Sequence, residues 1–238
     1  MNWFLLGGAL ACAGFVQSLT GFGFGLVSMS LLPFFMSVKE AAAISTVFSF
    51  MATITTFIRH AHDYNWRLGF NFFISLCLGV PIGVYFLEKT NEVLLCRVLG
   101  AIMILIAARE FLWKKPLIHI PNFLTVPLGL FSGALSGAFN LGGTPTAAYA
   151  YAHPWSRGQI MAFLQVTITT SCALRMIGYG KFGYFKEFSW TRGALIAIPL
   201  YLAIWLGHAL LQKINPKQIR CGVFVFIGVA GIYYLLIR

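Results

Sequence analysis

Apolar runs of roughly helical length dominate the chain, and short polar stretches separate them. The runs cover Trp3–Leu19, Phe24–Met36, Ala41–Ile58, Leu68–Leu87, Val93–Phe111, Phe123–Phe139, Thr144–Ala152, Ile160–Ile177, Gly193–Leu211 and Ile219–Ile237. A helix needs about 20 residues to cross a hydrocarbon core about 30 Å thick. The first two runs, taken as one straight helix, would reach about 50 Å, which is too long for one crossing. The chain is therefore expected to break between them.

The break falls in the stretch TGFGFGLVSM, which starts at Thr20 and carries three glycines inside an apolar segment. Glycine costs roughly 1 kcal/mol against alanine in a helix interior. The stretch lacks the third glycine of a dinucleotide-binding fingerprint, because Leu26 stands there, and it lacks the Gly-Lys-Ser/Thr of a phosphate loop. Gly21, Gly23 and Gly25 are therefore interpreted as a turn at membrane depth.

The second half of the chain repeats the pattern of the first. Small or polar residues of the stretch from Gly14 to Gly25 recur at the same spacing between Gly133 and Thr144. Further on, Trp66, Gly69, Gly83 and Asn91 recur as Trp190, Gly193, Gly207 and Asn215. We expect a single transmembrane domain over residues 1–238, with repeat 1 at about 3–112 and repeat 2 at about 122–238. An odd number of crossings per half inverts the second repeat, as in many secondary transporters, and is our prediction; an even number would leave the repeats parallel.

The composition predicts an all-α polytopic membrane protein with about eight to ten membrane segments. Hydrophobic residues make up 59% of the chain and charged residues 10%, and the mean hydropathy is +0.81. A soluble domain carries about 25% charged residues. The net charge of +11 does not indicate nucleic-acid binding here, because most basic residues lie in short loops where they meet lipid headgroups. The lipid bilayer is the expected partner, and the oligomeric state stays open.

Two helix breaks at matching positions predict one shared central site. Non-helical backbone at membrane depth is tolerated only where protein or a water-filled cavity satisfies it. The helix arms that begin near Phe24 and Thr144 would present N–H groups and positive dipole ends, an arrangement that binds anions. Thr46 and Gln165 occupy equivalent mid-span positions and are expected to face the breaks. The predicted substrate-binding residues are Gln17, Ser18, Thr20, Gly21, Gly23, Phe24, Gly25, Thr46, Asn140, Gly142, Gly143, Thr144 and Gln165.

Close helix packing is the alternative role for the small residues. Gly14 with Ser18, and Gly133 with Gly137, have the spacing of GxxxG-like packing surfaces. The tight clusters GFGFG and NLGGTP are interpreted as breaks instead, because several small residues lie within one turn.

An enzyme would need a nucleophile, a base or a metal cluster, and no such constellation is visible, so no cofactor or metal is expected. The loop sequence His60-x-His62-Asp63 could hold a metal ion, yet a charged loop is the favoured interpretation. Arg175, near the end of its apolar run, is expected to extend to the membrane interface rather than line a path.

Both copies of the pattern small-x3-small-x2-small-x-Gly-small-small resemble the sulfite exporter family (TauE/SafE), also described as the anion permease family. The family pattern is close to GFxSGxxGxGGG; here Asn140 and Thr144 replace two glycines, and the first copy has Ser18 and Phe24. The resemblance covers nearly the whole chain. It implies a multi-pass transporter of the bacterial inner membrane that exports sulfite, sulfonates such as sulfoacetate, or related small anions by alternating access. The departures leave the substrate open, with an anion channel or a transporter of a carboxylate as the alternative.

Overall fold

The computed structural model describes residues 3–112, 120–186, 188–210 and 216–236, and all regular structure within these ranges is helical. The first half contains α1 (Trp3–Thr20), α2 (Phe24–Leu31), α3 (Val38–His60), α4 (Phe70–Lys89) and α5 (Glu92–Leu112). The second half contains α6 (Asn122–Phe139), α7 (Gly143–Tyr151), α8 (Arg157–Lys181), α9 (Trp190–Leu210) and α10 (Pro216–Leu236). Two 3₁₀ turns, η1 (Leu32–Phe34) and η2 (Ala61–Asp63), follow α2 and α3.

Each half begins with a long helix that breaks and continues into a short one. The breaks lie between α1 and α2 and between α6 and α7, where the glycine pattern predicts them. Five described helices, α1, α3, α4, α6 and α8, are long and apolar enough to cross a membrane. The chain is thus an all-α polytopic membrane protein, as predicted.

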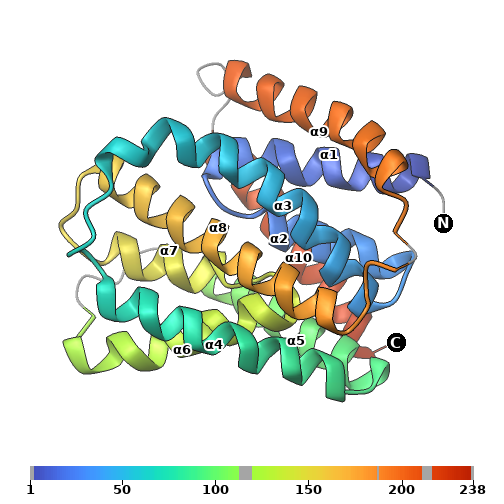
Figure 1. Ribbon diagram of the computed structural model, residues 1–238, viewed down its shortest axis with the longest axis horizontal. Helices are drawn as coiled ribbons and strands as arrows, with labels where there is room; N and C mark the ends of the chain where they lie inside the picture. The colour runs from blue at the N-terminus through green and yellow to red at the C-terminus, as the bar shows by residue number, and fades with distance from the viewer. Residues whose placement is uncertain (1–2, 113–119, 187, 211–215, 237–238) are drawn as a thin grey trace.

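The principal helix pairs each join one helix of the first half to one of the second. They are α4 with α6, α5 with α10, α1 with α9, and α3 with α8. Figure 1 shows α1 and α9 along one side of the molecule, α4 and α6 along the opposite side, and α3 and α8 between them. The two halves therefore interlock, and the short helices α2 and α7 lie within this frame.

Corresponding links of the two halves lie at opposite ends of the molecule. In Figure 1 the connection from α3 to α4 is at the left end of the longest axis, and the connection from α8 to α9 is at the right end. The short helices α2 and α7 bring the number of helices in each half to five within the described residues. This arrangement is the one that an inverted repeat requires; the inversion relative to a membrane stays a prediction.

Small residues allow the closest of these pairs to form. A Cβ added to Gly133 of α6 would lie 2.1 Å from the Leu76 carbonyl oxygen of α4, and one added to Gly137 would lie 2.2 Å from that of Val80. Carbon–oxygen contacts normally need about 3.3 Å, so α4 and α6 could not pack this closely with larger residues. The packing interpretation of Gly133 and Gly137 is therefore confirmed.

The pair of α1 and α9 is built in the same way. A Cβ on Gly207 of α9 would lie 1.8 Å from the Ser18 hydroxyl oxygen of α1. A Cβ on Gly14 would lie 2.5 Å from Cδ1 of Leu200. Gly14 and Ser18 thus form a packing face toward α9, which also confirms the interpretation of their spacing.

Candidate functional site

The first break is a turn that only glycine adopts readily. Gly21 and Gly23 have φ angles of 78° and 113°, both in the left-handed region where a side chain is strained. Gly23 precedes the first residue of α2, Phe24, so the chain reverses within three residues. The prediction of a turn inside the apolar segment is confirmed for Gly21 and Gly23, whereas Gly25 lies within α2 and is not part of the turn.

Two glutamine side chains hold this turn from different helices. Oε1 of Gln17, in α1, accepts a hydrogen bond from the N–H of Phe24 at 3.1 Å. Nε2 of Gln165, in α8, donates to the carbonyl oxygen of Gly21 at 2.8 Å. The first N–H of α2 is therefore capped by Gln17. The expectation of a free N–H group at the start of this arm is wrong for Phe24. Gln165 thus faces the first break, as expected, through Nε2, while its buried Oε1 has no hydrogen-bond partner within the described residues.

The second break uses different chemistry. Asn140 ends α6 with a φ angle of 59°, and its amide suits that conformation better than most side chains do. Gly142 has ordinary helical angles, but a Cβ there would lie 2.5 Å from the Ser132 carbonyl oxygen. The Ser132 hydroxyl donates to the Gly142 carbonyl oxygen at 2.8 Å and lies 2.8 Å from the Thr146 hydroxyl. Ser132 thereby ties the start of α7 to α6.

The two breaks touch each other through their backbones. A Cβ added to Gly25 of α2 would lie only 1.7 Å from the carbonyl oxygen of Asn140. The Asn140 amide also donates to the Ser45 hydroxyl of α3 at 2.7 Å, and Ser45 lies 2.6 Å from the Ser28 hydroxyl of α2. Segments far apart in the sequence are thus joined at one point in the interior.

A cavity opens beside this contact. It has about 410 Å³ of empty space, opening included. Its walls come from both breaks and from α3, α4, α6 and α8, and among the described residues that line it none is ionisable. The lining residues are Gln17, Gly23, Phe24, Gly25, Leu26, Ser49, Leu76, Ser136, Asn140, Leu141, Gly142, Gly143, Thr144, Thr146, Thr167, Ile168 and Ser171. A small solute would therefore meet mainly hydroxyl, amide and backbone groups.

Eight of the predicted site residues line this cavity: Gln17, Gly23, Phe24, Gly25, Asn140, Gly142, Gly143 and Thr144. The other five do not line it. Gly21 and Gln165 support the first turn. Ser18 lies against α9, and Thr20 and Thr46 donate to the Val16 and Ala42 carbonyl oxygens of their own helices.

One lining hydroxyl is left without a protein partner. Within the described residues, the Thr144 hydroxyl oxygen is buried and makes no hydrogen bond. Buried polar groups are normally paired, so such a group in a cavity marks a place where a solute or water binds. Thr144 lies in the first turn of α7, where Gly142 and Gly143 also line the cavity.

Several polar lining residues escaped the sequence reasoning. Ser136 on α6, Ser49 on α3, and Thr167 and Ser171 on α8 are all buried and line the cavity. Their signal is a spacing of four residues, which puts polar groups on one helix face. Three such polar stripes exist: Ser45, Ser49 and Thr53; Ser132, Ser136 and Asn140; and Thr167, Ser171 and Arg175.

The expectation for Arg175 is wrong. Its side chain is fully buried rather than extended to the interface. Nε donates to the Ser171 carbonyl oxygen at 3.2 Å, and a terminal nitrogen donates to the Ser136 carbonyl oxygen at 3.2 Å. The other terminal nitrogen lies 2.9 Å from Sγ of Cys172. Arg175 continues the polar stripe of α8, so it faces α6 instead of lipid.

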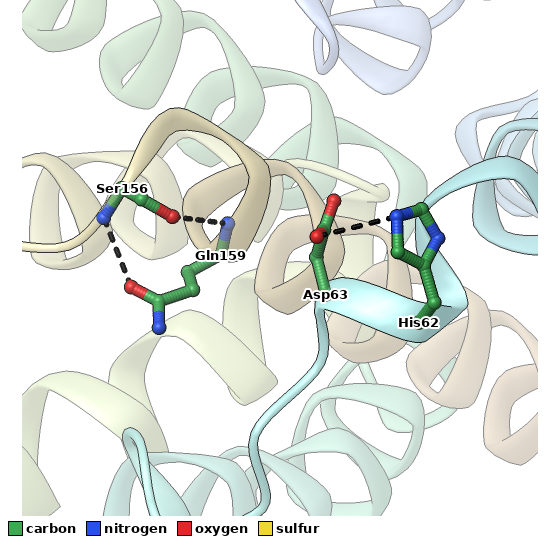
Figure 2. A network of polar contacts seen from close by, with 4 residues as sticks. All are labelled: His62, Asp63, Ser156 and Gln159. Carbon is green, nitrogen blue, oxygen red and sulfur yellow. Dashed lines mark hydrogen bonds and ion pairs between the residues drawn. The ribbon is translucent and has the colours of Figure 1, made fainter.

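The start of α8, which positions this stripe, is fixed by polar contacts outside the cavity. Figure 2 shows Ser156 and Gln159 in reciprocal hydrogen bonds, a capping box, with Ser156 N to Gln159 Oε1 at 2.9 Å and Gln159 N to Ser156 Oγ at 3.3 Å. The Asp63 carboxylate lies beside this turn, because a Cβ on Gly158 would be 2.6 Å from its Oδ2. A carboxylate at a helix N-terminus is stabilising.

The alternative metal site falls in this loop. His62 is exposed, and its Nε2 lies 3.3 Å from Oδ1 of Asp63. The part of the chain that the structure describes contains no group of three or more potential metal ligands. The side chain of His60 lies outside the described residues. Asp63 therefore serves the helix start in this structure.

Comparison with known proteins places the chain among membrane transporters. The model of the family described as sulfite exporter TauE/SafE matches residues 6–234. A protein of Methanocaldococcus jannaschii described as a probable membrane transporter protein is 26% identical, over 94% of this chain and 91% of its own length. A protein of Cupriavidus necator described as a probable sulfite/organosulfonate exporter TauE is 24% identical, over 92% of this chain and 90% of its own. No solved structure matches the chain significantly.

Proposed function

This chain belongs to the sulfite exporter TauE/SafE family, and on that premise we propose that it exports small sulfur-containing anions such as sulfite or organosulfonates. The chain is a membrane transporter and not an enzyme. The substrate is proposed to bind in the cavity where the two helix breaks meet. The observation that carries this proposal is a buried polar cavity lined by both breaks, with hydroxyl and amide donors and no carboxylate among its described lining residues.

The cavity chemistry suits a small oxyanion. Sulfite and sulfonate oxygens accept hydrogen bonds, and the Thr144 hydroxyl can donate to them without leaving a protein partner. The Ser136 and Ser171 hydroxyls already donate, to the Ser171 hydroxyl and to the Ile168 carbonyl oxygen, and would have to turn from these partners to bind the anion. The unpartnered Thr144 hydroxyl is the first donor we assign to the substrate. The start of α7 adds the positive end of a helix dipole. Phe24 and Leu76 offer apolar surface to the carbon part of a sulfonate.

Alternating access is the proposed mechanism of movement. The interlocked halves and the opposite positions of corresponding links are the arrangement used by transporters with inverted repeats. The breaks lie at the centre of this arrangement, so a solute there could be exposed first to one side and then to the other. The proposed location is the inner membrane of a bacterium.

Counterflow in proteoliposomes tests the proposal. Vesicles preloaded with unlabelled sulfite or sulfoacetate should take up the labelled anion faster than vesicles without it, because a carrier exchanges solute on both sides. Uptake should saturate and should be inhibited by sulfonates more than by carboxylates of similar size. Preloaded vesicles that contain no protein give the background uptake.

Two results would contradict the proposal in different ways. Linear flux that never saturates and shows no counterflow would indicate an anion channel. Saturable counterflow of carboxylates, with no competition by sulfite or sulfonates, would leave the carrier mechanism in place and overturn the substrate class.

A further inference from the structure

Arg175 is a buried positive charge that no carboxylate balances within the described residues. Its side chain is 0% exposed, and the partners of its guanidinium group are two backbone carbonyl oxygens and a thiol. None of the ion pairs between described residues includes it. The described acidic residues lie at helix ends or in links: Glu40, Asp63, Glu88, Glu92 and Glu110. Since a guanidinium group is always protonated in proteins, Arg175 keeps its charge in the interior.

A buried charge of this kind is unfavourable unless it has a function. Desolvation of an ion in a low-dielectric interior is compensated only by strong partners, and an ionisable residue inside a membrane segment marks a substrate path by default. Carbonyl oxygens satisfy part of the hydrogen-bonding capacity of Arg175 but supply no negative charge. The charge is therefore free to act on an ion nearby.

The cavity adjoins the residues that bind Arg175. Arg175 binds the carbonyl oxygens of Ser136 and Ser171, and both residues line the cavity. The Ser136 hydroxyl donates to that of Ser171 at 3.1 Å, so the two form one wall between the guanidinium group and the empty space. Only one layer of residues separates the positive charge from a bound solute.

The charge is present in one half of the chain only. The spacing that aligns Gln165 with Thr46 places Thr56 of α3 at the position equivalent to Arg175. The Thr56 hydroxyl lies 3.5 Å from the Ala52 carbonyl oxygen of its own helix. The positive charge therefore lies on the side of the cavity that the second half of the chain forms.

We propose that Arg175 is the specificity-determining charge of this cavity, which makes it bind a small monoanion in preference to a neutral solute of the same shape. Arg175 acts through space, behind the Ser136–Ser171 wall, and does not touch the substrate. The inference rests on the proposed function only in that the transported solute occupies this cavity. The hydroxyl and amide groups of the lining recognise shape, and Arg175 recognises charge.

Methanesulfonate and dimethyl sulfone form a suitable pair of probes, because they have nearly the same shape and differ by one negative charge. The wild-type protein in nanodiscs should bind methanesulfonate more tightly than the sulfone. Arg175→Gln should raise the Kd of methanesulfonate at least about tenfold, since a charge one layer away is weakly screened in the interior. The Kd of dimethyl sulfone should change less than twofold. Arg175→Lys, which keeps the charge, should retain most of the preference.

The matched control is Arg97→Gln, which removes an equal charge from an exposed position on α5. It should leave both Kd values unchanged. A purely structural role for Arg175 would weaken both probes in proportion, and that result would overturn the inference. Equal binding of the two probes by the wild type would overturn it as well. If Arg175→Gln does not fold, Arg175→Lys decides, because loss of the preference in a folded, charge-retaining variant would also overturn it.

Acetate and acetone, tested in the same way, separate this inference from the proposed function. Wild-type protein that binds acetate but no sulfur oxyanion, with the preference over acetone lost in Arg175→Gln, would support the role of Arg175 and refute the substrate class. Sulfite counterflow together with a charge preference that Arg175→Gln does not change would support the proposed substrate class and refute the role of Arg175.

Discussion

Replacing Gly25 with alanine tests whether the backbone contact between the two breaks gives the cavity its shape. The new Cβ would start 1.7 Å from the Asn140 carbonyl oxygen and 2.8 Å from its carbonyl carbon. A carbon–oxygen contact needs about 3.3 Å, so the breaks must separate by roughly 1.6 Å. Overpacking of this kind costs about 1–3 kcal/mol. Donors displaced by that distance lose their hydrogen bonds, so the Kd of the substrate should rise at least tenfold, or about 1.4 kcal/mol.

The assay is ligand binding and thermal unfolding of the purified protein, with Gly8→Ala as the matched control. Gly8 lies in α1, and a Cβ there would meet nothing within 4 Å. Gly8→Ala should leave binding unchanged and keep or raise the stability, by up to about 1 kcal/mol. A Gly25→Ala variant with the Kd and melting temperature of the wild type would show that the breaks can separate without consequence, and the reasoning would fail.

Two further predictions concern topology and pH. Single cysteines at Asn65 and Phe185, in a cysteine-free background, should react with an impermeant reagent from opposite sides of the membrane; labelling from one side would refute inverted repeats. Tyr184, in the link after α8, donates to the Glu88 carboxylate, and burial together with this bond raises the pKa of Tyr184. Tyr184→Phe should lower the free energy of unfolding by about 0.5–1.5 kcal/mol at pH 8, because Tyr184 is partly exposed and water screens the bond. That difference should shrink above pH 10, where the unfolded wild type ionises first; a constant difference in melting curves from pH 8 to 11 would contradict the assignment.

The positions of the two breaks could be predicted because glycine leaves a direct mark on the sequence. Gly21 and Gly23 have positive φ angles, and Gly25 allows the close approach of Asn140, each of which a side chain would oppose. A straight helix from Trp3 to Met36 would also be longer than the membrane is thick, so a break before Met36 could be predicted. These are local constraints, so one sequence was enough to see them.

The direction in which a polar residue faces could not be predicted in the same way. Arg175 lies near the end of an apolar run, which is the position of a residue that extends to the interface. It faces inward because α8 lies among α3, α4 and α6, and the Ser136 carbonyl oxygen of α6 binds it. Gln17 was expected to bind a solute; it lines the cavity but also caps Phe24. Single hydroxyls such as that of Ser136 are common in membrane helices, so its role depends on which helix lies opposite.

The pairing of α1 with α9 has a consequence for the assembly of the protein in the bilayer. α1 is synthesised long before α9, so its face of Gly14 and Ser18 meets lipid until α9 inserts. The Ser18 hydroxyl donates to the Phe15 carbonyl oxygen of its own helix at 2.7 Å, so this donor is satisfied within α1 before α9 is present. α8 differs, because one of the hydrogen bonds of Arg175 goes to another helix, at the Ser136 carbonyl oxygen of α6. The bond between Arg175 and Ser136 can therefore form only once α8 lies beside α6.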